Sequence, residues 1–145
     1  MNTVSEDLLN RILDAPVGQV VAVLGEILNC NIHLEVIEQN AITPHQFVRK
    51  IAIIANELPV IKAYVEFDST VLPESIMSEL LKKKRGVGTI LNINNIKATR
   101  NVISFHRNTD ERLVLRKYEI IYDGIVWFTI LEEIRLDNFG SDNNN

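Results

Sequence analysis

Two charged residues interrupt strand faces that are otherwise apolar, and both could act on a ligand. In the segment FVRKIAIIA, residues 47–55, both alternating faces are largely apolar, so either Arg49 or Lys50 must point inward. Arginine suits that position better, because its planar guanidinium binds a carboxylate through two parallel hydrogen bonds. A buried guanidinium is costly unless it is paired or binds an anion. Arg49 is therefore a candidate anchor for an acidic ligand.

The last expected strand, 125–136, shows the same anomaly with the opposite charge. Glu132 interrupts its most apolar face, whereas Glu133 falls on a mixed face near Arg135 and is expected to be solvated. Two interpretations remain open. Arg49 and Glu132 either pair with each other as a buried ion pair, or they lie at opposite ends of a cavity. Such a cavity would suit a small ligand that bears a carboxylate and a hydroxyl.

The elements that must position these residues are three helices and a set of antiparallel strands. Apolar residues at helical spacing predict the helices, and alternation with a period of two predicts the strands. Asp123-Gly124 is a strong two-residue hairpin signal, since glycine tolerates the positive φ that such a turn requires. The expected helices are 5–13, 16–29 and 73–84, and the expected strands are 32–37, 47–55, 59–67, 102–107, 113–122 and 125–136.

These elements predict an α+β fold, a single antiparallel sheet of about six strands with helices packed on one side. We expect one domain over residues 1–136 and a polar, frayed tail over 137–145. The basic run 82–84 is expected in the last turn of the third helix, where it complements the helix dipole. The segment 86–88, Gly-Val-Gly, is expected to end that helix and lacks the pattern of a dinucleotide-binding loop.

Composition excludes several classes of function. The formal net charge is −4, which argues against nucleic-acid binding. The single cysteine, Cys30, cannot form an intrachain disulfide or a thiolate cluster, and the three histidines lack a metal-ligand spacing. We therefore predict no metal and no cofactor. The polar N-terminus and the lack of a long apolar run predict a cytoplasmic protein with no signal peptide and no membrane partner.

The order of the segments resembles the chorismate lyase family, whose fold is shared by the ligand-binding UTRA domains of some transcription regulators. The similarity spans residues 8–136, and the order and spacing of several segments carry it. These are ILDAPVGQVV, FVRKIAII, LPVIKAYVEF, VLPESI, GVGTIL, ATRNVISF and FTILEEI.

The resemblance implies a chorismate lyase-like arrangement of the site. A strand arginine, here Arg49, would hold the carboxylate of the product together with two backbone amides. By position, the first amide lies near Val17, and the second lies near Val87, beside Gly88. The segment 9–16 is the candidate for a flap over the site.

The resemblance also implies that a glutamate of the last strand faces the ring hydroxyl of the product. That residue is Glu132, with Glu133 as the alternative, and strand alternation favours Glu132. Arg100 and Arg116 are candidate partners for the second carboxylate of the substrate. The chain departs from the family at 16–18, Pro-Val-Gly, where many members carry a turn rich in serine and threonine.

The activity that the resemblance implies is elimination of pyruvate from chorismate to give 4-hydroxybenzoate. We expect a monomer or a weak homodimer, and the only binding partner that we expect is the small-molecule substrate, chorismate. Two alternatives remain open. One is a non-catalytic UTRA-like domain that senses a small carboxylate, and the other is a related lyase that forms another hydroxybenzoate. UTRA domains normally follow a winged-helix DNA-binding domain, and we expect none here because the residues before the first strand are too few.

Overall fold

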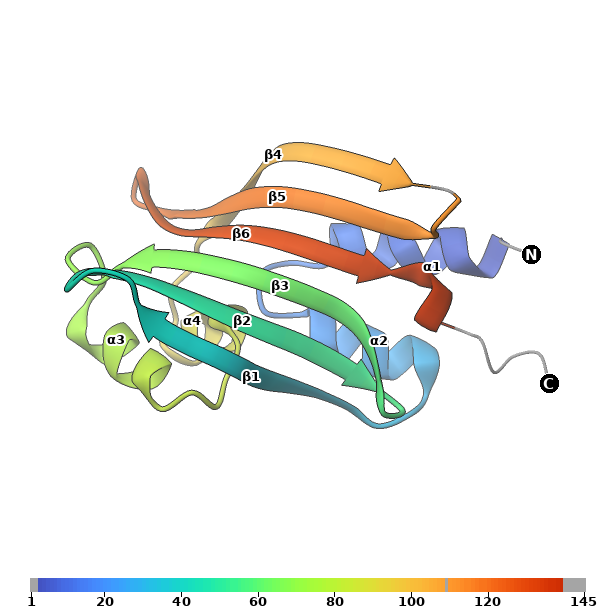
Figure 1. Cartoon of the computed structure of the whole chain (residues 1–145), viewed down its shortest axis with the longest axis horizontal. Helices are drawn as coiled ribbons and strands as arrows, with labels where there is room; N and C mark the ends of the chain where they lie inside the picture. The colour runs from blue at the N-terminus through green and yellow to red at the C-terminus, as the bar shows by residue number, and fades with distance from the viewer. Residues whose placement is uncertain (1–2, 109, 140–145) are drawn as a thin grey trace.

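A six-stranded antiparallel sheet with helices on one face forms the fold, as the sequence predicted (Figure 1). The computed structural model describes residues 3–108 and 110–139. The elements in chain order are α1 (Thr3–Asp14), α2 (Val20–Leu28), β1 (Ile32–Ala41), β2 (Gln46–Ala55), β3 (Leu58–Asp68), α3 (Glu74–Leu81), α4 (Val87–Ile93), β4 (Thr99–Asn108), β5 (Leu113–Tyr122), β6 (Ile125–Arg135) and the short 3-10 helix η1 (Leu136–Asn138).

The sheet consists of two three-stranded meanders that meet in its centre, in the order β1-β2-β3-β6-β5-β4. Tight hairpins join β2 to β3 and β5 to β6. Asp123 and Gly124 both have positive φ, 54° and 76°, so the predicted two-residue hairpin is confirmed. Asn56 and Glu57 also have positive φ, 54° and 70°. The chain between the two meanders, 69–98, holds α3 and α4.

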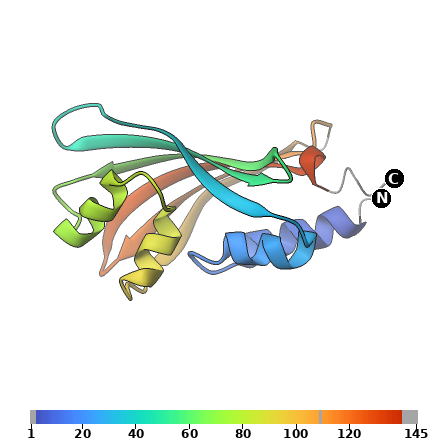
Figure 2. The same cartoon turned by 90° about the horizontal axis from the view of Figure 1, so that it is seen from below.

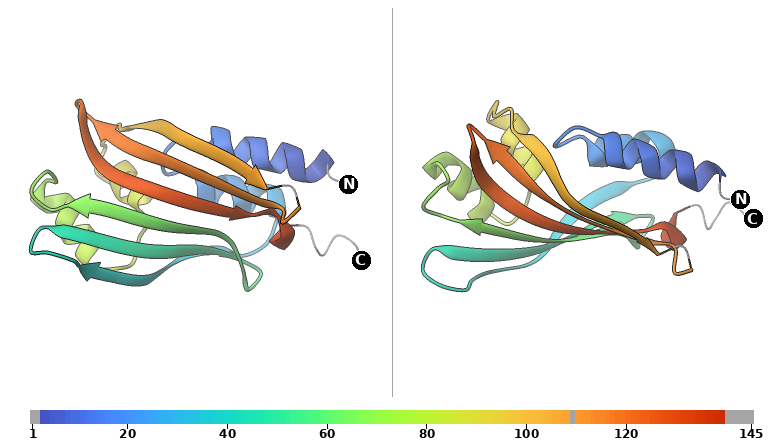
Figure 3. Two further views of the ribbon diagram at one scale, coloured as in Figure 1. Left: turned by 45° about the horizontal axis from the view of Figure 1, so that its top comes forward. Right: turned by 90° about the horizontal axis from the view of Figure 1, so that it is seen from above.

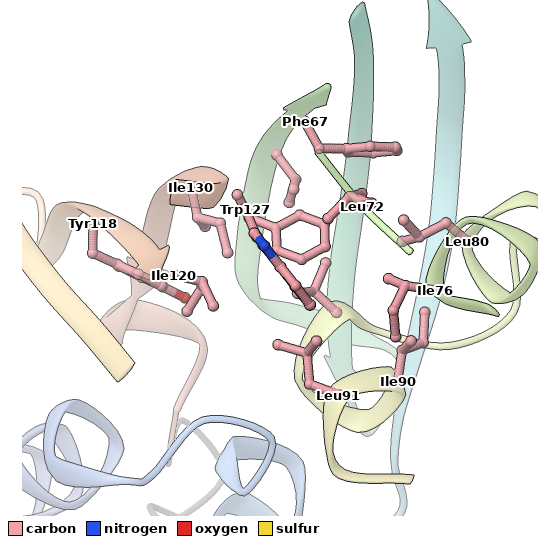
Figure 4. Packing of buried hydrophobic residues seen from close by; sticks show 13 residues of the cluster. Phe67, Leu72, Ile76, Leu80, Ile90, Leu91, Tyr118, Ile120, Trp127 and Ile130 are labelled. Atoms are coloured by element: carbon pink, nitrogen blue, oxygen red, sulfur yellow. The ribbon is translucent and has the colours of Figure 1, made fainter. Parts of the chain in front are cut away.

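The helices form two pairs over one face of the sheet. Figures 2 and 3 show α1 and α2 at one end of that face and α3 and α4 at the other. Each pair covers its own core cluster. Under α1 and α2, the largest fully buried side chains include Ile12, Leu24 and Ile134. Under α3 and α4, the buried Trp127 indole lies among side chains of the sheet and of both helices (Figure 4).

The helix boundaries correct three of our expectations. The second helix begins at Val20 rather than at residue 16, because Gly18 has φ +86°, which a right-handed helix cannot accommodate. The third helix ends at Leu81, and Lys83 has φ +58°, so the basic run lies beyond its last turn. Gly86 does not end a helix. It is the extended residue that precedes α4, a helix that the sequence pattern missed.

The described C-terminal end is packed against the domain. Leu136 and Phe139 are buried with the α1–α2 cluster, and the Asn138 amide donates a hydrogen bond to the Pro59 carbonyl at 2.6 Å. The packed chain therefore continues past the boundary expected at 136, and the rest of the expected tail lies outside the described residues. No helix in the described part of the chain is long and apolar enough to span a bilayer.

Candidate functional site

A cavity of about 100 Å³ opens on the helix-covered face of the sheet. Its floor comes from β2, β3, β5 and β6, and is mainly aliphatic. Its walls come from the α1–α2 linker and the first turn of α4. Six of the residues that the sequence singled out line this cavity, and they are Val17, Arg49, Val87, Gly88, Arg100 and Glu132. The other two candidates, Arg116 and Glu133, are not among its lining residues. The fold thus brings the six together, although their functional roles stay predictions.

Arg49 is fully buried, and each of its three guanidinium nitrogens already donates to the protein. Nε donates to Gln39 Oε1 at 2.8 Å, Nη1 to the Arg85 carbonyl at 2.6 Å, and Nη2 to the Leu80 carbonyl at 3.1 Å. Burial lowers the pKa of Arg49 to about 10, so the group remains a cation at neutral pH. Arg49 therefore holds the C-terminal end of α3 and the following turn against the sheet.

Glu132 pairs with Arg116, so the first of the two interpretations that the sequence left open, an ion pair between Arg49 and Glu132, is wrong. Arg116 lies directly opposite on β5, and its Nε donates to Glu132 Oε1 at 2.9 Å. Its Nη2 lies 2.7 Å from the same oxygen, an ion-pair contact that is poorly aligned for a hydrogen bond. Both residues are buried, with 2 % and 4 % of Arg116 and Glu132 exposed. Glu133 lies on the outer face and pairs with Arg135.

Tyr118 completes this buried cluster. Its hydroxyl donates to Glu132 Oε2 at 3.3 Å. Burial, and next the charge of Glu132, raise the pKa of Tyr118 well above its usual value, so the phenol stays protonated. The guanidinium carbons of Arg100 and Arg116 lie 4.9 and 4.8 Å from the centre of its ring, within the range of cation–π attraction.

The arginines beside Tyr118 also hold the end of α1. Arg116 Nη1 donates to the Leu13 carbonyl at 3.1 Å, and Arg100 Nη1 donates to the Ala15 carbonyl at 2.8 Å. The expected flap, 9–16, is thus mostly helix, since α1 continues to Asp14. The linker between α1 and α2 lines the cavity through Val17 and Gly18, and Arg100 of the sheet binds the Ala15 carbonyl of that linker.

The linker contacts the first turn of α4 through two glycines. A Cβ on Gly88 would lie 2.5 Å from both Cα and N of Gly18, so the two backbones touch. The Asn92 amide also donates to the Val17 carbonyl, at 3.4 Å. This contact closes the cavity wall between the two helix pairs.

Gly88→Ala is expected to lower the free energy of unfolding by about 2 kcal/mol, because its methyl group would overlap backbone atoms that cannot move aside independently. Gly25→Ala is the matched control. Its methyl group would make an ordinary 3.8 Å contact with Ile32 inside α2, and is expected to stabilise the protein by about 0.5–1 kcal/mol. Urea denaturation of both variants measures the difference. Equal stabilities would contradict the close backbone contact.

Sequence reasoning assigned no role to Tyr118 or Gln39, and the signal for Tyr118 was present. Arg116 and Tyr118 lie between Val114 and Ile120 on the buried face of β5, so they interrupt an apolar face as Arg49 does on β2. Gln39 carried no such signal, because β1 is interrupted by a register shift between Val36 and Glu38. Within the described residues, no group of three histidine, cysteine, aspartate or glutamate side chains is placed to hold a metal ion.

Solved structures of transcription regulators have a fold similar to that of this chain. The effector domain of PhnF from Mycobacterium smegmatis matches with a TM-score of 0.60 and 6 % identity, over 86 % of this chain and 92 % of that domain. A longer chain of PhnF from the same organism matches with a TM-score of 0.60 and 6 % identity, over 82 % of this chain and 64 % of that chain. The possible transcriptional regulator YydK from Bacillus subtilis matches with a TM-score of 0.51 and 12 % identity, over 77 % and 61 %.

Identities this low establish a likeness of fold alone. The expected UTRA-like fold agrees with these neighbours, whereas none of them supports the chorismate lyase family specifically. No protein-family model matches the chain, and no curated protein matches it.

Proposed function

We propose that this domain binds a small organic molecule in the cavity and acts as a ligand-sensing domain rather than as an enzyme. The observation that carries the proposal is a cavity lined by two cations, the buried Arg49 and the half-buried Arg100, with an aliphatic floor, in a fold similar to the effector domain of PhnF. The floor residues Ile51, Ile61 and Ile130 suit the apolar body of a ligand.

The state of Glu132 supports binding rather than catalysis. A general base must reach the proton that it removes and be free to accept it. Both carboxylate oxygens of Glu132 already accept hydrogen bonds, one from Arg116 and one from Tyr118. The cavity therefore offers polar groups that can orient a ligand, whereas the Glu132 carboxylate already accepts hydrogen bonds from the protein.

Binding without turnover is the expected result when the purified protein is mixed with small carboxylates, starting with 4-hydroxybenzoate. A ligand at 100 times its Kd stabilises the folded state by about 2.7 kcal/mol, which a thermal melt detects readily. Ala63→Phe should abolish the stabilisation, because Ala63 lines the cavity floor and a phenyl ring there would fill it. Lys62→Ala, on the opposite face of β3, should leave binding unchanged. Equal binding by the Ala63→Phe variant would place the ligand elsewhere.

Chorismate lyase activity is the second candidate. One observation favours it, because Arg49, Glu132, Val17 and Val87 line the same cavity, as the resemblance to the chorismate lyase family implies. Cleavage of the ether to the enolpyruvyl group, with loss of the adjacent ring hydrogen, makes the ring aromatic and needs no cofactor. In this reaction Arg49 would anchor the ring carboxylate and Glu132 would hold the ring hydroxyl.

One chromatogram of the products from chorismate separates the candidates. Formation of 4-hydroxybenzoate and pyruvate would support the lyase, and another hydroxybenzoate would indicate a related lyase. Unchanged chorismate that nevertheless raises the melting temperature would support the ligand-sensing domain.

A further inference from the structure

We propose that the cavity takes an amphipathic ligand in one orientation, with its hydrogen-bonding group over the β5–β6 half of the floor and its apolar end over the β2–β3 half. This rests on the proposed function, namely that the cavity binds a small molecule. It adds the chemical class of that molecule, which is compact and polar at one end only. The observation behind it is that two equivalent units of the fold line the cavity with side chains of different polarity.

The two halves of the fold are equivalent units, 67 residues apart. Strands β1, β2 and β3 begin at residues 32, 46 and 58, and β4, β5 and β6 begin at 99, 113 and 125, so each strand recurs after 67 residues (99 − 32, 113 − 46 and 125 − 58). The register shift between Ile53 and Ile54 recurs with the same spacing, between Ile120 and Ile121. Figure 1 shows the two meanders side by side, joined where β3 lies next to β6.

This equivalence explains why Arg49 is buried without requiring a ligand. Arg49 donates to the Leu80 carbonyl near the end of α3, and Arg116 donates to the Leu13 carbonyl near the end of α1. Both pairs of residue numbers differ by 67, so each arginine holds the first helix of the other unit. Arg116 has this role although it does not line the cavity. Anchoring of the helix therefore accounts for Arg49, whose guanidinium nitrogens all donate to the protein already.

The side chains that the two units contribute to the cavity differ in polarity. Leu34 and Arg100 are equivalent by register, because they lie opposite the same position of β2 and of β5. Seven equivalent pairs line the cavity, and they are Val20/Val87, Val21/Gly88, Leu34/Arg100, Ile51/Tyr118, Ile53/Ile120, Ala63/Ile130 and Val65/Glu132. The first unit contributes an aliphatic side chain to every pair. All three hydrogen-bonding side chains of these pairs belong to the second unit.

The hydrogen-bonding side chains form one continuous group. The Tyr118 hydroxyl donates to Glu132, and the Arg100 guanidinium carbon lies 4.9 Å from the centre of the Tyr118 ring. A hydroxyl and a carboxylate each keep lone pairs for a further hydrogen bond, so a polar group of the ligand has partners in this half. In the aliphatic half, the same group would lose its hydrogen bonds to water without replacement. This difference fixes the orientation of the ligand.

Nuclear Overhauser effects test the orientation, with 4-methylphenol as the probe and the wild-type protein labelled at the δ1-methyl groups of isoleucine. The methyl group of the probe should show effects to Ile51 and Ile53 that are stronger than those to Ile120. The ring protons beside the probe hydroxyl should show the reverse order. The opposite orientation, or equal effects to both halves, would overturn the inference and leave the proposed function intact.

A pair of probes of equal size tests the polarity of the aliphatic half. Benzene-1,4-diol differs from 4-methylphenol in having a second hydroxyl in place of the methyl group. Calorimetry on the wild-type protein should show at least about 10-fold tighter binding of 4-methylphenol, since the second hydroxyl finds no partner. Val65→Thr adds a hydroxyl to the aliphatic half with little change in shape, and should reduce this ratio by about 5-fold or more.

Val48→Thr is the matched control for Val65→Thr. Val48 precedes Arg49 on β2 and faces the outer side of the sheet, so the ratio should stay at its wild-type value. An unchanged ratio in a folded Val65→Thr variant would overturn the inference while both probes still bind. Failure of both probes to bind the wild-type protein would count against the proposed function and overturn the inference with it. The orientation experiment uses the wild-type chain, so it decides the question even if Val65→Thr does not fold.

Discussion

Arg49→Ala is expected to lower the free energy of unfolding by about 3–4 kcal/mol. The substitution removes a fully buried guanidinium and the hydrogen bonds that it donates to Gln39 Oε1 and the Arg85 carbonyl. The Leu80 carbonyl loses one donor and keeps the side-chain amide of Gln39. Hydrogen bonds from a charged donor contribute about 1.5–3 kcal/mol each, and groups left unsatisfied in the interior add to the loss. Urea denaturation followed by circular dichroism measures the effect, and the midpoint should fall without a change in slope.

The neighbouring lysine provides the control for Arg49. Lys50 lies on the outer face with half of its side chain exposed, in a loose 3.7 Å contact with Glu38, so Lys50→Ala should change stability by less than about 0.5 kcal/mol. Arg49→Lys should also be destabilising, because an ammonium cannot reach three acceptors in a planar arrangement. If Arg49→Ala kept full stability but lost ligand binding, Arg49 would be a ligand anchor and its structural role would be wrong.

Glu132→Ala should cost about 3 kcal/mol of unfolding free energy. Arg116 is 2 % exposed, and removal of Glu132 would leave its charge uncompensated in the interior. Tyr118 would lose the acceptor of its hydroxyl at the same time. Glu133→Ala is the matched control, since Glu133 lies on the outer face in a partly exposed pair with Arg135, and should cost less than about 1 kcal/mol.

A double variant separates the ion pair from the rest of the site. Replacing both partners, in Glu132→Leu with Arg116→Met, should recover most of the stability that Glu132→Ala loses, because apolar residues of similar volume often replace a buried ion pair at little cost. The recovery would be incomplete, since Arg116 also donates to the Leu13 carbonyl. Additive losses in the double variant would contradict a direct interaction between the two residues.

Strand alternation was the most informative part of the sequence. It placed Arg49 and Glu132 on the inner face of the sheet and Glu133 on the outer face, and the structure confirms all three positions. Alternation works here because successive side chains of a strand must point to opposite faces, whatever the rest of the chain does. The sequence signal for the hairpin at Asp123-Gly124 was equally local, because it depends only on two residues that can adopt positive φ.

The helices were predicted less well because their ends depend on contacts with distant residues. The second helix begins only after Gly18, whose backbone lies against Gly88 from a segment far along the chain. The helix α4 is short and follows Gly86, so the glycines beside it resembled the end of the preceding helix. Neither feature can be derived from helical periodicity, which describes the middle of a helix better than its ends.

The sequence by itself determined that this chain folds as an antiparallel sheet with helices on one side, and that Arg49 and Glu132 face those helices. Both conclusions rest on local geometry, because hydrophobic period and strand alternation act between near neighbours. Only the tertiary structure decided the partners. Arg49 donates to carbonyl groups at and after the end of α3, and Glu132 pairs with Arg116, which lies opposite it on β5. The Arg100 side chain donates to the Ala15 carbonyl. Such pairings depend on which strands are neighbours, which is fixed by packing of the whole domain rather than by any single segment.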